Sequence, residues 1–215
     1  HTAHATYEDA EKESLTILEV YRRFAEEYMA LPVLRGLKSE SEKFAGADHT
    51  YTIEAMMQDG KALQAGTSHH LGQNFAKAFD VKFQNENGEQ EYVYATSWGL
   101  STRMVGALIM AHGDDKGIII PPKLATPQLI IIPIFRKPEQ RALVLERIDR
   151  IVSGLSQVEF KIDAREQYSP GWKFNHWEQR GVPLRLELGP KDLEKNQVVL
   201  SRRDTGEKSF ISQDM

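Results

Sequence analysis

Arg103 is the residue whose type and position most clearly suggest chemistry. It precedes an apolar run, residues 104–111, which predicts a helix with no polar face and therefore a buried helix. Gly99 is expected to end the strand before it, and Ser101 and Thr102 are suitable N-cap residues. A guanidinium in the first turn of a buried helix needs an anion, because an unpaired buried charge is strongly unfavourable. On these grounds alone the anion is either a structural carboxylate or a ligand phosphate.

Histidines offer a second kind of chemistry, metal binding. His1 and His4 are three residues apart, but no further ligand follows them at a suitable spacing. His69, His70 and His112 would have to come from other elements. The chain has no cysteine, which excludes disulfides and cysteine-based zinc sites. We therefore predict no metal site built from protein ligands, and we interpret His70 as an ordinary residue at the start of a helix.

The first half of the chain supplies the elements that must position these residues. Residues 7–30 have the apolar spacing of an amphipathic helix, with Thr6 as its predicted cap. Residues 50–57 and 61–67 predict a hairpin, and the Asp59–Gly60 pair is typical of a type I′ turn. The other expected elements are a helix over residues 71–79, a hairpin turning at Asn87–Gly88, a strand at residues 92–94 and a buried strand at residues 117–120. Antiparallel strands with helices on one side indicate an α+β domain, which we place at residues 1–125.

Beyond this point strands and helices alternate. Apolar and turn patterns predict strands at residues 129–134, 158–162 and 183–188, and helices at residues 138–154 and 169–180. This alternation predicts a small α/β domain over residues 126–215. Residues 1–125 carry 12 Lys/Arg against 18 Asp/Glu, whereas residues 126–215 carry 15 against 13. The second domain is therefore the more suitable of the two for RNA.

Composition limits the classes of protein that remain. With 215 residues, 40% hydrophobic and 27% charged, the chain can form one or two cores and is not expected to be disordered. No apolar run reaches the roughly 18 residues of a membrane helix, and no signal peptide is evident. We expect a cytoplasmic protein that does not enter a membrane.

Several segments together resemble one family. The segments TSWGLSTRMVGALIMAHGD, KSESEKFAGA, ALQAGTSHHLGQNF and SPGWKFNHWEQRGVPLRLELGPKDLEKNQVVLSRRDTGEK are similar to prolyl-tRNA synthetases, members of the class II aminoacyl-tRNA synthetases. The first of them resembles motif 3 of that class. The resemblance runs along essentially all of the chain. It implies part of the antiparallel class II catalytic core, followed by an α/β anticodon-binding domain with a mixed sheet.

The resemblance also implies substrates and site residues. ATP, Mg²⁺, proline and tRNA(Pro) would be the ligands, and the parent enzyme would be a homodimer. ATP would contact Gln64, Thr67, Ser101, Thr102 and Arg103, of which Arg103 is the catalytic residue that binds the triphosphate. Proline would contact His1, Phe44 and His69, and the anticodon would contact Glu178, Arg185 and Lys191.

Some alternatives stay open. Gln64 and Thr67 differ in parity, so a regular strand would point them to opposite faces unless a bulge near Gly66 intervenes. Arg202 and Arg203 either contact RNA phosphate or serve solubility. The resemblance begins after the motif-2 arginine and leaves no room for an editing insertion, so we expect the archaeal/eukaryotic-like type and no activity from this chain alone. A noncatalytic tRNA-binding or regulatory relative is the alternative function.

Overall fold

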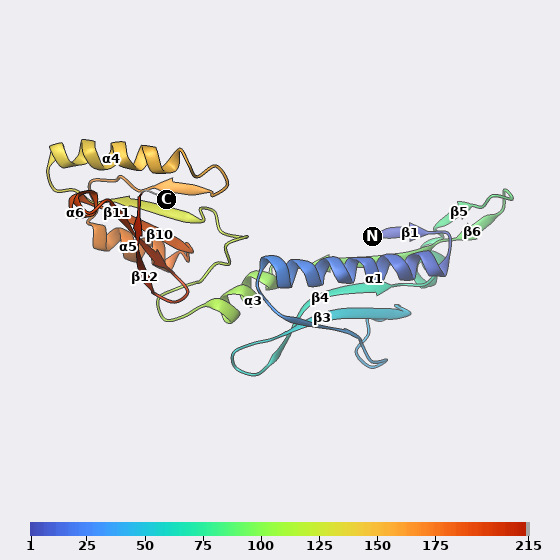
Figure 1. Ribbon diagram of the computed structural model, residues 1–215. Helices are drawn as coiled ribbons and strands as arrows, with labels where there is room; N and C mark the ends of the chain where they lie inside the picture. Colours follow the sequence, from blue (N-terminus) through green and yellow to red (C-terminus); the bar gives the residue numbers. More distant parts are fainter. Residues whose placement is uncertain (214–215) are drawn as a thin grey trace. The chain divides into compact units, whose positions relative to one another are not determined.

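The computed structural model describes residues 1–213 and divides the chain into two compact units, residues 1–111 and 112–215 (Figure 1). The division lies before the domain boundary expected at residues 125 and 126. The buried Arg203 binds both carboxylate oxygens of Asp114 and the carbonyl oxygen of Gly117, so the segment after residue 112 belongs to the second unit.

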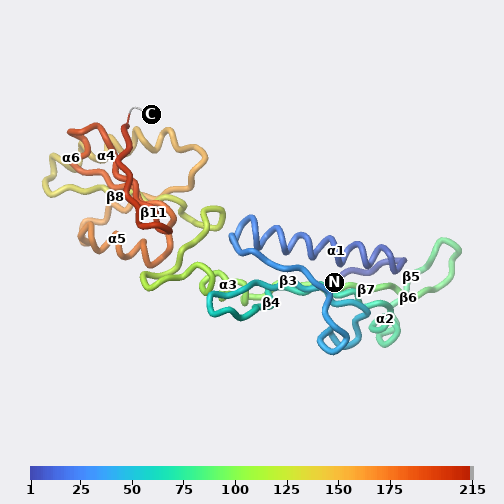
Figure 2. Tube along the Cα trace, turned by 60° about the horizontal axis from the view of Figure 1, so that its bottom comes forward, coloured from blue at the N-terminus to red at the C-terminus, as the bar shows by residue number. Residues whose placement is uncertain are grey.

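The first unit is built on a five-stranded sheet in the order β1-β7-β4-β3-β2. Every neighbouring pair is antiparallel, and β3, β4 and β7 form its centre (Figure 2). The strands are β1 Thr2–His4, β2 Val33–Leu37, β3 His49–Met56, β4 Ala62–His70 and β7 Tyr94–Leu100. Helix α1, Tyr7–Arg23, runs along one face of this sheet (Figure 1). The predicted α+β arrangement is confirmed.

Helix α1 begins as predicted and ends differently. The Thr6 hydroxyl accepts a hydrogen bond from the backbone N–H of Asp9 at 3.1 Å, which caps the helix. Ser14, fully buried, accepts a hydrogen bond through its carbonyl oxygen from the Ser68 hydroxyl, which ties the helix to the sheet. The predicted helix over residues 7–30 instead changes to a π-helix at Phe24–Tyr28. Ala30 then takes a positive φ of 50°, which ends the helical path.

The β3–β4 hairpin is confirmed, but its turn type is not. Gly60 has a φ of 78°, whereas Asp59 has no positive φ, and a type I′ turn requires both. The N–H of Gly60 donates to the carbonyl of Met57, whose own N–H donates to Lys61, so the loop comprises residues 58–60. A type I turn followed by a left-handed glycine gives this pattern.

The next elements lie outside this sheet, and two of them form a separate two-stranded sheet. Helix α2, Asn74–Phe79, starts later than predicted, and strands β5, Lys82–Gln84, and β6, Gln90–Tyr92, form the expected second hairpin. Gly99 does not end a strand, because it pairs with Thr67 inside β7. A glycine with an extended backbone can continue a ladder when its neighbours are paired.

Helix α3, Arg103–His112, forms where it was predicted but is not buried. Val105, Ile109 and Met110 are about half exposed, and Met104 and Ala107 are the buried positions. The helix follows the end of β7 and buries only two of its residues, so its apolar composition did not determine its burial. Residues 117–120, expected as a buried strand, are half-buried and belong to no strand, although Gly117 forms an isolated bridge with Asp114.

The second unit has a five-stranded mixed sheet in the order β12-β11-β10-β8-β9. Strand β8 is parallel to β9 and β10, while β10, β11 and β12 are antiparallel, which confirms the expected mixed sheet. The elements are β8 Leu129–Pro133, α4 Pro138–Val152, β9 Phe160–Ile162, α5 Pro170–Gln179, β10 Leu184–Leu188, α6 Pro190–Glu194, β11 Gln197–Arg202 and β12 Lys208–Ser212.

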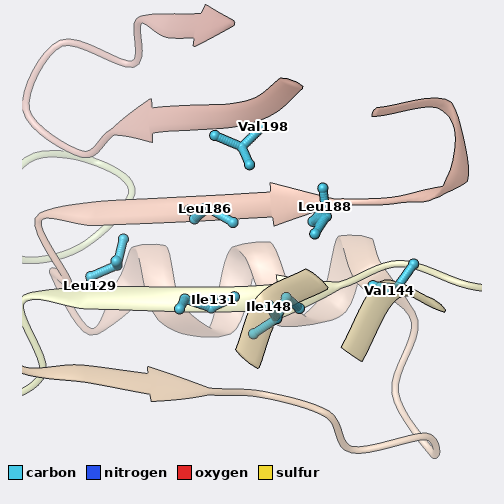
Figure 3. Packing of buried hydrophobic residues seen from close by; sticks show 7 residues of the cluster. All are labelled: Leu129, Ile131, Val144, Ile148, Leu186, Leu188 and Val198. Carbon is cyan, nitrogen blue, oxygen red and sulfur yellow. The ribbon is translucent and has the colours of Figure 1, made fainter. Parts of the chain in front are cut away.

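Strand β8 is buried on both faces, as its continuous apolar sequence predicts. On one face Leu129 and Ile131 pack with Val144 and Ile148 of α4 (Figure 3). On the other face Ile130 and Ile132 pack with residues that include Trp177 of α5. Within residues 1–213, no helix has the length and apolarity needed to span a membrane.

Candidate functional sites

The sheet of the first unit has two different faces. Gly66, Ser68 and His70 of β4 face α1: a Cβ on Gly66 would lie 3.2 Å from Tyr21, and Ser68 and His70 bond to α1 carbonyl oxygens. Successive side chains on a strand alternate, so Thr67 and His69 point to the opposite face. We call this the open face.

A bulge brings Gln64 to the open face as well. Thr67 pairs with Thr52 and Gly66 with Ile53, but Glu54 pairs with Gln64, so Ala65 is the extra residue. Directly paired residues share a face, and Thr52 and Glu54 are two residues apart. Gln64 and Thr67 therefore lie on one face despite their different parity, which resolves the conflict seen in the sequence.

Small residues form a row across the open face. Thr52 of β3 pairs with Gly36 of β2 and with Thr67 of β4, and Thr67 pairs with Gly99 of β7. A Cβ added at Gly36 or Gly99 would meet no atom within 4 Å. The row is therefore a shallow floor with space above it, suitable for a flat ligand.

His69 is held at one side of this floor. The Thr50 hydroxyl accepts a hydrogen bond from the N–H of Phe44 and lies 3.0 Å from His69 Nδ1. The Phe44 ring lies 5.1 Å from the His69 ring, centroid to centroid. Burial, with a smaller contribution from the charge of Lys38, lowers the pKa of His69 below its usual value. His69 is thus neutral at pH 7, and Nδ1 can accept from Thr50.

His1 and Phe44 line an apolar cavity of about 460 Å³. Phe75, Val93 and Ser97 are among its other walls. Ser97 is the direct cross-strand neighbour of His69, although His69 itself does not line the cavity. Two of the three residues implied for proline, His1 and Phe44, therefore line one apolar cavity. The third, His69, contacts the Phe44 ring without lining the cavity.

Arg103 is exposed, which corrects the expectation of a buried guanidinium. Its side-chain Nη1 donates to the main-chain oxygen of Gln64 at 3.3 Å, and its backbone N–H donates to the Ser101 hydroxyl at 3.3 Å. Ser101 and Thr102 are also exposed at this helix start. Gln64, Ser101, Thr102 and Arg103 thus lie at one end of the open face.

The described residues contain no group of three or more His, Cys, Asp or Glu side chains able to enclose a metal ion. Among the strands of this sheet, Glu54 is the acidic residue on the open face, and it lies beside Gln64. Mg²⁺ is commonly held by one or two carboxylates together with substrate phosphates and water. The residues present fit such a shared ion and do not fit a metal cage formed by protein alone.

His70 is not at a helix start, as the sequence suggested, but at the end of β4. It is fully buried; its Nδ1 accepts from the N–H of Gly72, so Nε2 carries the proton and donates to the Tyr7 carbonyl at 3.1 Å. Both ring nitrogens are satisfied, which makes His70 a structural residue.

The second unit has a small cavity of about 50 Å³ between α5 and the strands β10 and β11. Glu178, Arg185 and Lys208 line it. Arg185 Nε donates to Glu187 at 3.0 Å, and its guanidinium lies 4.3 Å from the centre of the Phe174 ring. Arg202, Arg203 and the ring of Trp177 also line it, so the cavity combines a carboxylate, four basic side chains and an aromatic ring. Groups of these kinds bind unpaired bases.

Lys191, the third residue implied for this site, lies on α6 and does not line the cavity. Arg203 is buried and donates to Asp114, to Gly117 and to the Glu178 carbonyl oxygen. Two alternatives were left open for Arg203, contact with RNA phosphate and solubility, and a buried, paired guanidinium fits neither. Arg202 is exposed and pairs with Asp204 at 2.6 Å.

Sequence reasoning missed several residues of both sites. Ser97 could have been found as a neighbour of His69 only from the strand register. Phe174 and Lys208 face Arg185 from an adjacent helix and from a strand that was not predicted. Lys38 lies in the segment KSESEKFAGA, from which the resemblance implied only Phe44 as a site residue. Its contact with Gln64 joins residues far apart in the sequence, so the sequence alone did not indicate it.

Comparisons with known proteins identify a family for each part of the chain. Residues 1–112, more than half of the chain, match the family described as tRNA synthetase class II core domain (G, H, P, S and T). Residues 128–214 match the family described as anticodon binding domain. All of the chain aligns with the proline–tRNA ligases of Natranaerobius thermophilus, at 60% identity, and Chlorobium limicola, at 59%. The proline–tRNA ligase of Salinibacter ruber is 57% identical. The chain spans 44% of the length of each of these relatives.

Proposed function

Because the chain belongs to the class II core family of tRNA synthetases, we propose that it is part of a proline–tRNA ligase. One observation carries the proposal: the bulge at Ala65 gives Gln64, Thr67 and His69 a common face that also holds an apolar cavity at its edge. A nucleotide and a small apolar amino acid can lie side by side on such a face.

The proposed reaction has two steps. A carboxylate oxygen of proline attacks the α-phosphorus of ATP, and the bond to pyrophosphate breaks, giving prolyl-adenylate. A ribose hydroxyl at the end of tRNA then attacks the prolyl carbonyl carbon, and AMP leaves. Neither step needs a covalent enzyme intermediate, so the protein acts by positioning and by neutralising charge.

The nucleotide lies over the row of small residues in this proposal. Gln64 and Thr67 contact it, Ser101 and Thr102 line the site, and Arg103 binds the triphosphate. When Mg²⁺ is bound, it supplies further positive charge at the phosphates. Glu54 and Gln64 are the residues that would hold the ion.

Proline is selected by shape rather than by side-chain hydrogen bonds. Phe44, exposed by 49%, offers an apolar wall to the ring, and His1 lies at the same cavity. A neutral His69 places no positive charge beside the ring, which suits an apolar substrate. Its position is fixed by Thr50.

The anticodon guanines are the proposed ligands of the second unit. Carboxylates accept from guanine N–H groups, whereas arginine and lysine donate to O6 and N7. Glu178 and Arg185 fit these roles, and Lys208, which pairs with Glu187 as Arg185 does, lines the same cavity. Lys191 remains the lysine implied by resemblance and would contact RNA outside the cavity. We also infer a cytoplasmic homodimer of the archaeal/eukaryotic-like type.

ATP–pyrophosphate exchange in the complete enzyme tests the function. We expect exchange with proline and much weaker exchange with alanine or cysteine, because these two amino acids lack the ring that the apolar cavity accepts. Absence of exchange with proline would contradict the proposal and favour a noncatalytic tRNA-binding relative. Exchange that is equally strong with alanine would contradict the assigned specificity.

Arg185→Ala tests the RNA site separately. The change removes the cation beside Phe174 and Glu187, and we expect binding of tRNA(Pro) to weaken about 10- to 100-fold. Filter binding at fixed salt measures it. Arg150→Ala is the control, because Arg150 lies exposed on α4 and pairs with Glu146. Equal loss with a tRNA whose anticodon guanines are replaced would rule out base recognition by Arg185.

A further inference from the structure

Lys38 reaches the middle of the open face. It directly follows β2, and its N–H donates to the Thr50 carbonyl at 2.9 Å, which continues the β2–β3 pairing by one residue. Lys38 is two residues from Gly36 and therefore shares its face. Its Nζ donates to the side-chain oxygen of Gln64, across the strand that carries Thr52. The ammonium thus lies over the floor.

Two cations therefore converge on one neutral residue. Lys38 binds the side-chain oxygen of Gln64, and Arg103 binds its main-chain oxygen. Among the described residues, neither cation pairs with a carboxylate, although most of the arginines in the same unit do. Neutral amide oxygens compensate a positive charge poorly, so this part of the face is suited to an anion.

The surrounding charges do not cancel this pair. Glu54 is on the same face beside Gln64 and contacts neither cation. Lys43 is paired with Glu40 in the loop after Lys38. His69 is neutral and faces Lys38 from β4. The excess of positive charge at Gln64 is therefore local.

We propose that Lys38 is a second phosphate-binding residue, which with Arg103 brackets Gln64 and holds the polyphosphate of the nucleotide. Lys38 gives up the neutral oxygen of Gln64 for a phosphate oxygen, which is a stronger, charge-assisted contact. Gln64 is then free to contact the rest of the nucleotide. This role rests on the proposed function for the identity of the nucleotide, but not for the anion site.

Tripolyphosphate binding to this chain tests the anion site directly. Titration calorimetry should show that Lys38→Met weakens binding about tenfold or more, whereas Lys38→Arg retains most of it. Lys61→Met is the matched control, since the Lys61 side chain is 84% exposed just after the β3–β4 loop. Equal affinity of wild type and Lys38→Met, or no binding by wild type, would overturn the proposal.

The imidazole resonances of His69 report on the same site without any substrate. Lys38→Met should raise the pKa of His69, because it removes a nearby positive charge, and tripolyphosphate should raise it in the wild type. An unchanged His69 pKa in Lys38→Met would place the ammonium elsewhere and overturn the proposal.

Results with ATP in the complete enzyme separate the two proposals. If Lys38→Met raises KM for ATP about tenfold while exchange with proline persists at saturating ATP, both stand. If tripolyphosphate binds through Lys38 but no exchange with proline occurs, the function fails and the anion site remains. If exchange occurs and Lys38→Met does not alter KM or kcat, the role of Lys38 is wrong.

Discussion

Replacing Arg103 with alanine is expected to lower kcat/KM for proline-dependent ATP–pyrophosphate exchange by about 100- to 1000-fold in the complete enzyme. Arg103 lies at the start of α3, with its guanidinium against the main-chain oxygen of Gln64, and it has no carboxylate partner among the described residues. A cation kept free in this way can follow the charge that develops as pyrophosphate departs. The loss should appear in kcat as well as in KM for ATP.

The fold should survive this change, because Arg103 is exposed and contributes one long hydrogen bond. Circular dichroism and the melting temperature should therefore match the wild type. Arg103→Lys should recover part of the activity, since it keeps the charge but not the planar fork. Arg23→Ala is the control, because Arg23 is exposed on α1 and pairs with Glu27. A loss below about tenfold would contradict the assignment of Arg103 to the triphosphate.

The sequence predicted the elements whose patterns are local. Apolar periodicity identified α1, a continuous apolar run identified β8, and Pro and Gly identified α4; Thr6 and Pro138 marked helix starts correctly. Burial was predicted less well, because it depends on neighbours that are distant in the sequence. Helix α3 shows this: its residues are almost all apolar, yet one of its sides has no partner in its unit.

The candidate sites depend on strand register, which the sequence states only weakly. Gln64 and Thr67 are on one face because of a single extra residue, Ala65, and the parity conflict was the sole sign of it. Lys38 and Ser97 joined the site through cross-strand neighbours rather than through motifs. The family resemblance implied which residues form the sites, whereas the strand register explains why those residues lie close together.

Replacing Asp163 with alanine is expected to destabilise the second unit by about 3 kcal/mol at pH 7. Asp163 is 2% exposed, follows β9, and accepts hydrogen bonds from Arg165 at 2.7 and 2.8 Å and from Trp177 Nε1 at 2.8 Å. Lys173, also buried, donates to its main-chain oxygen at 3.0 Å. Removing the carboxylate leaves the Trp177 N–H unsatisfied and Lys173 without its nearest negative charge, so α5 loses one of its attachments to the sheet.

The stabilisation that the Asp163 carboxylate provides changes with pH in a defined direction. Hydrogen bonds from Arg165, and then from Trp177, hold the pKa of Asp163 well below its usual range, although burial alone would raise it. A carboxyl with a lowered folded-state pKa stabilises the fold above its unfolded pKa, about 3.9, and this stabilisation is lost as the pH falls. The difference between wild type and Asp163→Ala should therefore be largest near pH 7 and should shrink below about pH 4.

Urea unfolding followed by tryptophan fluorescence, with hydrogen exchange of β8 to identify the second unit, measures this difference. Asp163→Asn should lose less than Asp163→Ala, because the amide oxygen can still accept from Trp177. Asp204→Ala is the control: Asp204 pairs with Arg202 at the surface, and its loss should change the free energy of unfolding by about 0.5 kcal/mol or less. A loss below about 1 kcal/mol for Asp163→Ala at pH 7, or a loss that grows as the pH falls below about 4, would show that α5 is held mainly by the packing of Trp177 against β8.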